Sequence, residues 1–244
     1  MAFVPVPRDG VAPTAFARRS PAYRQLLAAG ARFGARGWSA VALDFGDVRA
    51  EVAHGRTLGL ADLSPLPRLG FKGPGAFAWL RAQGLEFQDV PNRAWRQPDR
   101  ALAVTRSHSE ILLLSDRHGR SDLCARLQAQ AHAAMDERAY VLPRFDGLLW
   151  FALVGSQASA CLAKLCGVDL RPHKFANLAV AQTFVAARPG VVIRDDLGDT
   201  LAYHLLTDSP STDYFWDCLI DAMAEFGGTP VGLVALDALA VPSG

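Results

Sequence analysis

The sequence predicts an α+β fold built from pseudo-repeated β-α-β-β-α units. Two segments, 69–73 and 151–155, each predict a short strand that ends in glycine and leads into a helix, with Ala and Leu recurring at the same spacing after the glycine. Each copy is followed by a predicted strand pair and a second helix, the pairs falling at 101–115 and 191–208. Strands that return by hairpins and alternate with single helices favour antiparallel or mixed sheets covered by helices.

The elements outside the repeat follow from local signals. Residues 1–19 are rich in Pro, Ala and Arg and predict a flexible N-terminal arm. Ser20 and Pro21 predict the start of a helix that runs to Gly30, because serine caps a helix and proline suits its first position. Residues 41–52 have a strand-like pattern, and Ser121 and Ser211 are candidate caps for the later helices. Residues 20–244 are expected to form one unit of two intertwined subdomains, about 20–145 and 146–244.

Composition argues against some classes of function. The net charge is +1 and no basic run exceeds Arg18–Arg19, so the sequence lacks the charge that nucleic-acid binding needs. No apolar stretch approaches the ~20 residues of a membrane-spanning helix, and the first residues do not resemble a secretion signal. A cytoplasmic protein with no membrane partner is therefore expected.

Metal-binding and catalytic motifs are also missing from the sequence. The four cysteines (124, 161, 166 and 218) form no Cys-x-x-Cys pair, which predicts reduced core thiols and no metal site. There is no phosphate-binding loop, no Gly-x-Gly-x-x-Gly motif and no Gly-x-Ser-x-Gly motif. The six histidines are scattered and predict surface or hydrogen-bonded core positions.

An acidic cluster at 195–199 admits two interpretations. Asp and Gly suit a polar hairpin turn between two strands. Alternatively, one of its carboxylates could hold the amino-pyrimidine edge of a pterin, whose paired N–H donors match a carboxylate.

Blocks of sequence, in order, resemble the glycine-cleavage T-protein (aminomethyltransferase) family. Segments 20–23, 30–33 and 37–38 resemble its Thr-Pro-Leu-Tyr, Gly-Ala-Lys-Met and Gly-Trp blocks. Three later blocks of the family also have counterparts in this sequence. The first consists of Glu51, Arg56 and residues 59–64, and the second of Arg194, residues 198–199 and Tyr203. The third consists of residues 232–233 and 237–239. The resemblance implies a T-protein-type folate-binding domain, and with the sequence ending at Gly244 it implies that the family's C-terminal β-barrel is absent.

The sequence departs from the family where the chemistry lies. Aligned on 104–106, the family's acidic pair falls on Arg100 and Ala101, although a one-residue slip would bring in Asp99. The family's closing Arg and Glu fall on Ala240 and Pro242, so a cation suited to the carboxylates of folate is gone. The family resemblance therefore leaves Asp99 as the candidate catalytic residue, and Arg194, Asp199 and Tyr203 are candidates for holding folate.

Other features resemble the gamma subunit of heterotetrameric sarcosine oxidase, a short member of the same family. They are the Val-Ala-Gln-Thr segment, the Tyr-Phe-Trp helix and the Gly-Gly pair, at 180–183, 214–216 and 227–228. This resemblance implies an assembly subunit without its own active site, which binds no cofactor tightly and docks on the flavoprotein subunits of an N-demethylating oxidoreductase. Trp38, Trp95 and Trp150 are candidates for the docking surface.

Two further hypotheses remain open. The chain could be a tetrahydrofolate-dependent aminomethyltransferase or demethylase with a rearranged site, or a folate-binding protein without chemistry. The first would use Asp99, Arg194, Asp199 and Tyr203, which should then meet at one pocket large enough for a pterin. The second would keep the pocket but lack an acid to protonate the folate nitrogen.

Overall fold

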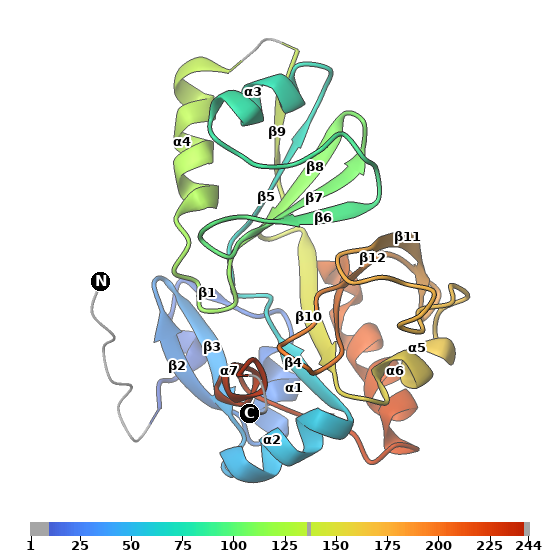
Figure 1. Cartoon of the computed structure of the whole chain (residues 1–244). Coiled ribbons are helices and arrows are strands. Elements are labelled where there is room, and N and C mark those ends of the chain that lie inside the picture. The colour runs from blue at the N-terminus through green and yellow to red at the C-terminus, as the bar shows by residue number, and fades with distance from the viewer. Residues whose placement is uncertain (1–9, 136–137, 242–244) are drawn as a thin grey trace.

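The chain folds into two β-sheets that pack face to face, with helices on both outer sides. The computed structural model describes residues 10–135 and 138–241 (Figure 1). One sheet has five strands in the order β6-β7-β8-β5-β9, and the other has six in the order β11-β12-β13-β10-β4-β14. The predicted α+β class is confirmed. No helix among these residues is long and apolar enough to cross a membrane.

The first copy of the repeat forms the five-stranded sheet, in which every pair of neighbouring strands is antiparallel. Its strands are β5 (Arg68–Lys72), β6 (Arg93–Arg96), β7 (Leu102–Ser107), β8 (Glu110–Leu114) and β9 (Tyr140–Pro143). Helices α3 (Ala76–Ala82) and α4 (Leu123–Ala134) cover its outer face.

The second copy forms most of the six-stranded sheet. Its strands are β10 (Leu148–Val154), β11 (Val180–Val185), β12 (Arg188–Arg194), β13 (Ala202–Asp208) and β14 (Thr229–Pro230). Strand β4 (Gly59–Asp62) comes from before the first copy and inserts between β10 and β14. The outer face carries α5 (Ala158–Ala163) and α6 (Thr212–Ala224). The two copies therefore share a strand order and a helix on the same side, which confirms the predicted repeat.

The alternation of side chains along β10 shows how one strand serves two cores. Odd-numbered residues pack toward α5 and α6, and even-numbered residues pack toward the other sheet. Leu102, Val104, Leu112 and Leu114 of β7 and β8 meet them from the opposite side. Because the side-chain period of a strand is two, both faces of β10 must be apolar, as a strand between two packed layers requires.

Glycine is needed where each repeat turns from strand to helix. Gly73 and Gly155 have φ of +122° and +112°. A Cβ atom at these positions would lie 2.1 Å from the carbonyl oxygen of Arg138 and 2.4 Å from that of Thr57. Only glycine allows this backbone conformation and this close approach, which explains why both predicted strands end in it.

The N-terminal segment forms a third, small sheet in the order β1-β3-β2. Its strands are β1 (Arg18–Arg19), β2 (Arg32–Arg36) and β3 (Ser39–Asp44), and they are preceded by a 3-10 turn at Pro13–Ala15. Residues 1–9 of the predicted arm lie outside the described residues. The predicted division into subdomains 20–145 and 146–244 stays a prediction.

Two predictions of local structure need adjustment. The helix expected from Ser20 is α1 (Tyr23–Ala28), which begins later because Ser20 Oγ accepts from the Ala22 N–H at 2.9 Å within a turn. The strand expected over 41–52 is wrong beyond Asp44, where β3 ends, because α2 (Val48–Thr57) occupies the rest of that range. Asp47 caps this helix by accepting from the N–H groups of Arg49 and Ala50, a local signal that outweighs the apolar pattern.

Helix α7 (Leu233–Leu239) closes the space between the sheets and is held in place by a buried carboxylate. Glu51 of α2 accepts from the Phe45 N–H at 2.7 Å and from the Gly232 N–H at 2.8 Å. Burial raises the pKa of Glu51 above its ordinary value, against the lowering effect of these two hydrogen bonds. This contact fixes the start of α7, and Leu236 of this helix and Ala240 directly after it line the cavity described next.

Candidate functional site

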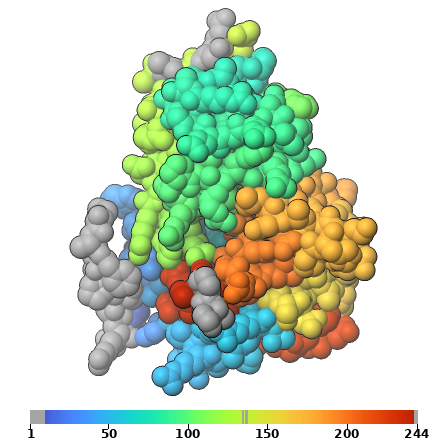
Figure 2. Space-filling view, viewed as in Figure 1, coloured from blue at the N-terminus to red at the C-terminus, as the bar shows by residue number. Residues whose placement is uncertain are grey.

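A cavity of about 320 Å³ lies where the two sheets and α7 meet. Figure 2 shows the green half of the chain, with the five-stranded sheet, seated on the orange and red segments of the six-stranded half. The cavity is lined from β6, β7, β10, β13, the segment after β8, the 195–198 turn and α7. Its volume is at the lower end of the range for small-molecule sites.

Apolar side chains make up much of the cavity wall. They come from both sheets and from α7, and are Leu63, Leu102, Trp150, Ala152, Leu197, Ala202, Leu236 and Ala240. The polar side chains are three arginines, two histidines, a serine and three aspartates, namely Arg96, Arg100, Arg117, His118, His204, Ser115, Asp116, Asp195 and Asp196. The cavity could therefore hold a ligand that has both an apolar part and a charged part.

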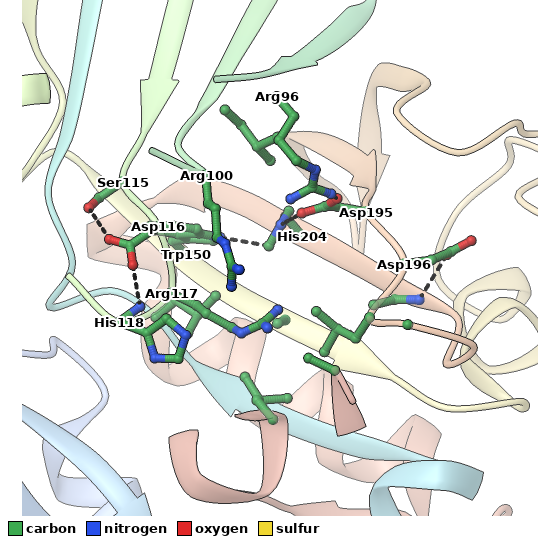
Figure 3. Close-up of a pocket in the computed structure, with 18 residues that line it drawn as sticks. Arg96, Arg100, Ser115, Asp116, Arg117, His118, Trp150, Asp195, Asp196 and His204 are labelled. Carbon is green, nitrogen blue, oxygen red and sulfur yellow. Dashed lines mark hydrogen bonds and ion pairs between the residues drawn. The ribbon is translucent and has the colours of Figure 1, made fainter. Parts of the chain in front are cut away.

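Four side chains form a continuous hydrogen-bonded row along one wall (Figure 3). Trp150 Nε1 donates to His204 Nδ1 at 3.1 Å, and His204 Nε2 lies 3.2 Å from Asp195 Oδ2. The other oxygen of Asp195 pairs with the guanidinium of Arg96. Trp150, His204 and Asp195 are all buried.

The row fixes the tautomer of His204. Since an indole N–H can only donate, Nδ1 of His204 must be the acceptor and therefore carries no proton. The ring proton is then on Nε2, where it is donated to Asp195. Both ring nitrogens of His204 are thus hydrogen-bonded within the core, as the sequence predicted for the scattered histidines.

The electrostatics of the row keep Asp195 ionised. Burial alone would raise the pKa of Asp195, but its interactions with His204 and then with Arg96 outweigh it, so this pKa lies below its ordinary value. Both oxygens of Asp195 are engaged. This carboxylate therefore supports the wall and offers no free oxygen to a ligand.

The second buried carboxylate, Asp116, shapes the loop after β8. Its Oδ1 accepts from the N–H groups of Arg120 at 2.7 Å and Ser121 at 2.9 Å, and Oδ2 accepts from the His118 N–H at 3.2 Å. These bonds turn the loop so that the Arg117 and His118 side chains line the cavity. Asp116 is therefore a structural residue.

Both of those side chains also approach Asp237 of α7. Arg117 Nε lies 3.4 Å and His118 Nδ1 3.3 Å from Asp237 Oδ1. Burial, aided by the charge of Arg117, lowers the pKa of His118 below its ordinary value despite the opposing effect of Asp237. His118 is then neutral at physiological pH.

Arg100 differs from the other charged residues of the cavity. It has a φ of +70°, and its side chain projects into the cavity (Figure 3). Within residues 10–135 and 138–241 its backbone N–H donates to the Gln97 carbonyl, and its guanidinium makes no hydrogen bond or ion pair. Its guanidinium is therefore available to a ligand.

A model of the GCVT N-terminal domain family matches residues 100–244, which include most of the cavity wall. The chain belongs to this family. The finding confirms the family resemblance that the ordered sequence blocks indicated.

Curated relatives in the family are aminomethyltransferases. The chain is 26% identical over 241 residues to the aminomethyltransferase of Frankia alni, with 93% of this chain and 64% of the relative aligned. It is 25% identical over 206 residues to that of Chloroherpeton thalassium, with 77% and 53% aligned. The chain thus spans between about half and two thirds of the length of these relatives.

Solved structures agree on the fold. The aminomethyltransferase T of the glycine cleavage system from Bartonella henselae matches with a TM-score of 0.71 at 19% identity, over 91% of this chain and 62% of that chain. A chain of heterotetrameric sarcosine oxidase from Corynebacterium sp. U-96 matches with a TM-score of 0.65 at 24% identity, over 86% of this chain and 96% of that chain. The T-protein-type domain is therefore established, and the described residues hold the repeat-built domain without a barrel.

The four residues singled out from the sequence do not meet at this cavity. Asp99 is exposed and accepts from the Ala101 N–H and from Ser121 Oγ. Arg194 pairs with Asp196, Tyr203 donates its buried hydroxyl to the Leu170 carbonyl, and Asp199 is exposed on the turn. None of the four is among the residues that line the cavity, so their suggested roles in catalysis and folate binding stay predictions.

The residues that do line the cavity were only partly visible in the sequence. Asp195 belongs to the acidic cluster and Arg100 occupies the aligned position of the family's acidic pair, but neither pattern indicated a shared site. Arg96, Arg117 and His118 carried no local signal, because each reaches the cavity only through the packing of the sheets. Ala240 lines the cavity where the family's arginine was aligned, and Pro242 lies outside the described residues.

The donor set does not fit a pterin held by a carboxylate. The two buried carboxylates of the cavity are engaged within the protein, Asp195 by Arg96 and His204, and Asp116 by backbone N–H groups. The amino-pyrimidine edge needs a carboxylate acceptor, and neither residue offers a free one. Among the described residues, no group of three or more His, Cys, Asp or Glu side chains is placed to hold a metal ion.

Proposed function

We propose that this GCVT-family chain is a non-catalytic assembly subunit of a flavin-dependent oxidoreductase that demethylates sarcosine or related N-methyl amines. The observation that carries the proposal is the chemistry of the cavity. A folate-dependent transferase needs a group to exchange protons with the reacting nitrogen, and the buried carboxylates of the cavity are committed to internal hydrogen bonds. Arg100 occupies one of the positions aligned with the family's acidic pair, and its guanidinium stays protonated.

The extent of the structural match supports a subunit role. The match to one chain of a heterotetrameric sarcosine oxidase covers 86% of this chain and 96% of that chain. The match to the glycine-cleavage aminomethyltransferase covers only 62% of that protein.

One exposed aromatic residue supports docking on a partner. Trp38, at the tip of the β2–β3 hairpin, is 82% exposed. Tryptophan is enriched at protein interfaces, where it anchors binding. Of the other two tryptophans considered for the docking surface, Trp150 is a core residue and Trp95 is partly buried. Trp38 is therefore the candidate that remains at the surface.

The test is to co-express the tagged full chain with the flavoprotein subunits of an N-demethylating oxidase and to assay the purified material. We expect the flavin absorbance and the oxidation of sarcosine to co-elute with the tag. Asp99→Asn should leave turnover unchanged, because the side chain keeps its hydrogen-bonding shape and has no chemical role. A loss of turnover of about a hundredfold or more in this variant would identify Asp99 as a general acid or base and refute the proposal.

The alternative is a tetrahydrofolate-dependent aminomethyltransferase or a folate-binding protein. It is favoured by the similarity to two aminomethyltransferases and by a cavity large enough for a small ligand. Calorimetric titration of the purified chain with tetrahydrofolate separates the two. Saturable binding that weakens in Asp199→Ala would favour the alternative, followed by an assay for one-carbon transfer from N-methyl amines. No heat at high micromolar ligand would favour the assembly role.

A further inference from the structure

The cavity contains more cationic groups than its own carboxylates can neutralise at close range. Of its three arginines, Arg96 is paired with Asp195. The guanidinium of Arg100, an exposed residue at the cavity, has no protein partner within residues 10–135 and 138–241. Arg117 meets Asp237 only through a 3.4 Å contact, and its buried Nε has no hydrogen bond.

The nearby carboxylates cannot turn to satisfy these arginines. Asp116 is held by three backbone N–H groups and Asp195 by His204 and Arg96. Asp196 is paired with Arg194 through both oxygens. A bound anion would supply the acceptor that Arg100 and Arg117 lack, since a guanidinium binds carboxylates through two parallel hydrogen bonds.

The remaining wall is apolar and includes Leu102, Leu197 and Leu236. An inorganic ion would leave this part of the cavity unfilled, whereas an organic acid would fill both parts. The volume of about 320 Å³ suits a compact molecule. We propose that this cavity binds a small organic carboxylate, whose carboxylate is held by Arg100 and Arg117 and whose apolar body lies against these leucines.

This inference goes beyond the assembly role and does not depend on it. A non-catalytic subunit could use such a site to sense or retain a metabolite. The binding test uses the purified full chain and needs no partner, so its outcome is separate from that of the co-expression experiment.

The experiment is a calorimetric titration with benzoate and with benzamide, its neutral analogue of nearly the same shape. We expect saturable binding of benzoate and binding of benzamide that is at least tenfold weaker, because only the carboxylate can accept two guanidinium hydrogen bonds. Arg100→Gln and Arg117→Gln should each weaken benzoate binding about ten- to a hundredfold, the effect of losing a charge-assisted hydrogen bond. Raised ionic strength should also weaken it.

Arg36→Gln is the matched control, because Arg36 lies on the β2–β3 hairpin and its side chain, among the described residues, donates only to the carbonyl of its neighbour Ala35. It should bind benzoate like the wild type. Near-ultraviolet circular dichroism verifies the fold of every variant, and Arg100 can be replaced without breaking any hydrogen bond within the described residues.

Each contrary outcome overturns the proposal in a different way. Equal affinity for benzamide and benzoate would show that charge is not recognised. Binding of inorganic phosphate without binding of benzoate would show an anion site with no role for the apolar wall. Binding of a carboxylate-free tetrahydropterin without binding of benzoate would make the cavity a pterin site. Absence of benzoate binding at millimolar concentration would refute the proposal outright.

Discussion

Replacing Asp195 with alanine tests whether the buried row along the cavity wall holds the two sheets together. Asp195 joins Arg96 of the five-stranded sheet to His204 of the six-stranded sheet, and its side chain is only 8% exposed. No other side chain in the described residues accepts from His204 Nε2. The substitution therefore removes one acceptor that serves both sheets.

The expected loss of free energy of unfolding is the sum of the contributions of the two broken contacts. His204 is 8% exposed, so its Nε2–H would be left buried without an acceptor, which costs about 1–3 kcal/mol. The side chain of Arg96 is 44% exposed and can turn to water, so its contact contributes at most about 1 kcal/mol. Asp195→Ala should thus lower the free energy of unfolding at neutral pH by about 2–3 kcal/mol.

The effect should depend on pH in a defined direction. The pKa of Asp195 is lower in the folded protein than its ordinary value of 3.8. A carboxylate with a depressed pKa stabilises the fold fully above its unfolded pKa, and this contribution is lost as pH falls through the folded pKa. The difference in stability between wild type and Asp195→Ala should be constant near neutrality and should shrink below about pH 3.8.

Urea unfolding followed by tryptophan fluorescence at several pH values measures both effects. Asp199→Ala is the control, because Asp199 is an exposed residue of the same turn and its replacement should change stability by less than about 0.5 kcal/mol. A loss below about 0.5 kcal/mol in Asp195→Ala, or a difference that grows on acidification, would refute the role assigned to the row.

Three further predictions concern glycine, cysteine and surface tryptophan. Gly155→Ala should destabilise the fold by about 2–4 kcal/mol in urea unfolding, since its Cβ would lie 2.4 Å from a backbone oxygen. Gly84→Ala, with positive φ but open space, should lose only about 1 kcal/mol, and equal losses would contradict the steric argument. Burial raises the pKa of Cys124 to about 12, so a thiol reagent should modify the partly exposed Cys218 first, as peptide mapping would detect. Trp38→Ser should leave the free energy of unfolding within about 0.5 kcal/mol of wild type but weaken co-elution with flavoprotein subunits, and unchanged co-elution would exclude it as an anchor.

Local patterns predicted the repeat correctly because its signals lie within short segments. Gly73 and Gly155 lie at two strand-to-helix turns, and their positive φ values favour glycine over other residues. The predicted strand over 41–52 failed where the local signals competed. Alternating apolar residues continue past Asp44, but the Asp47 cap starts a helix.

The site was less predictable, because it is made of residues from distant segments. Arg96 lies on β6 of the five-stranded sheet and Asp195 on the turn after β12 of the six-stranded sheet, and His118 reaches the cavity through a loop shaped by Asp116. Asp195 belonged to a cluster that suggested either a turn or a pterin ligand. The structure instead places it as a buried acceptor between Arg96 and His204.

By itself, the sequence determined the α+β class, the repeat and the family, because hydrophobic period, glycine turns and ordered blocks are properties of the chain alone. Tertiary structure alone decided which charged groups share the cavity and which of them stay free. Glu51 illustrates the difference. In the sequence it is one residue of a block that resembles the family, but in the fold its carboxylate accepts from the Phe45 and Gly232 N–H groups and so positions α7 over the cavity. Side-chain partners far apart in sequence are set by packing, so no local pattern can specify them.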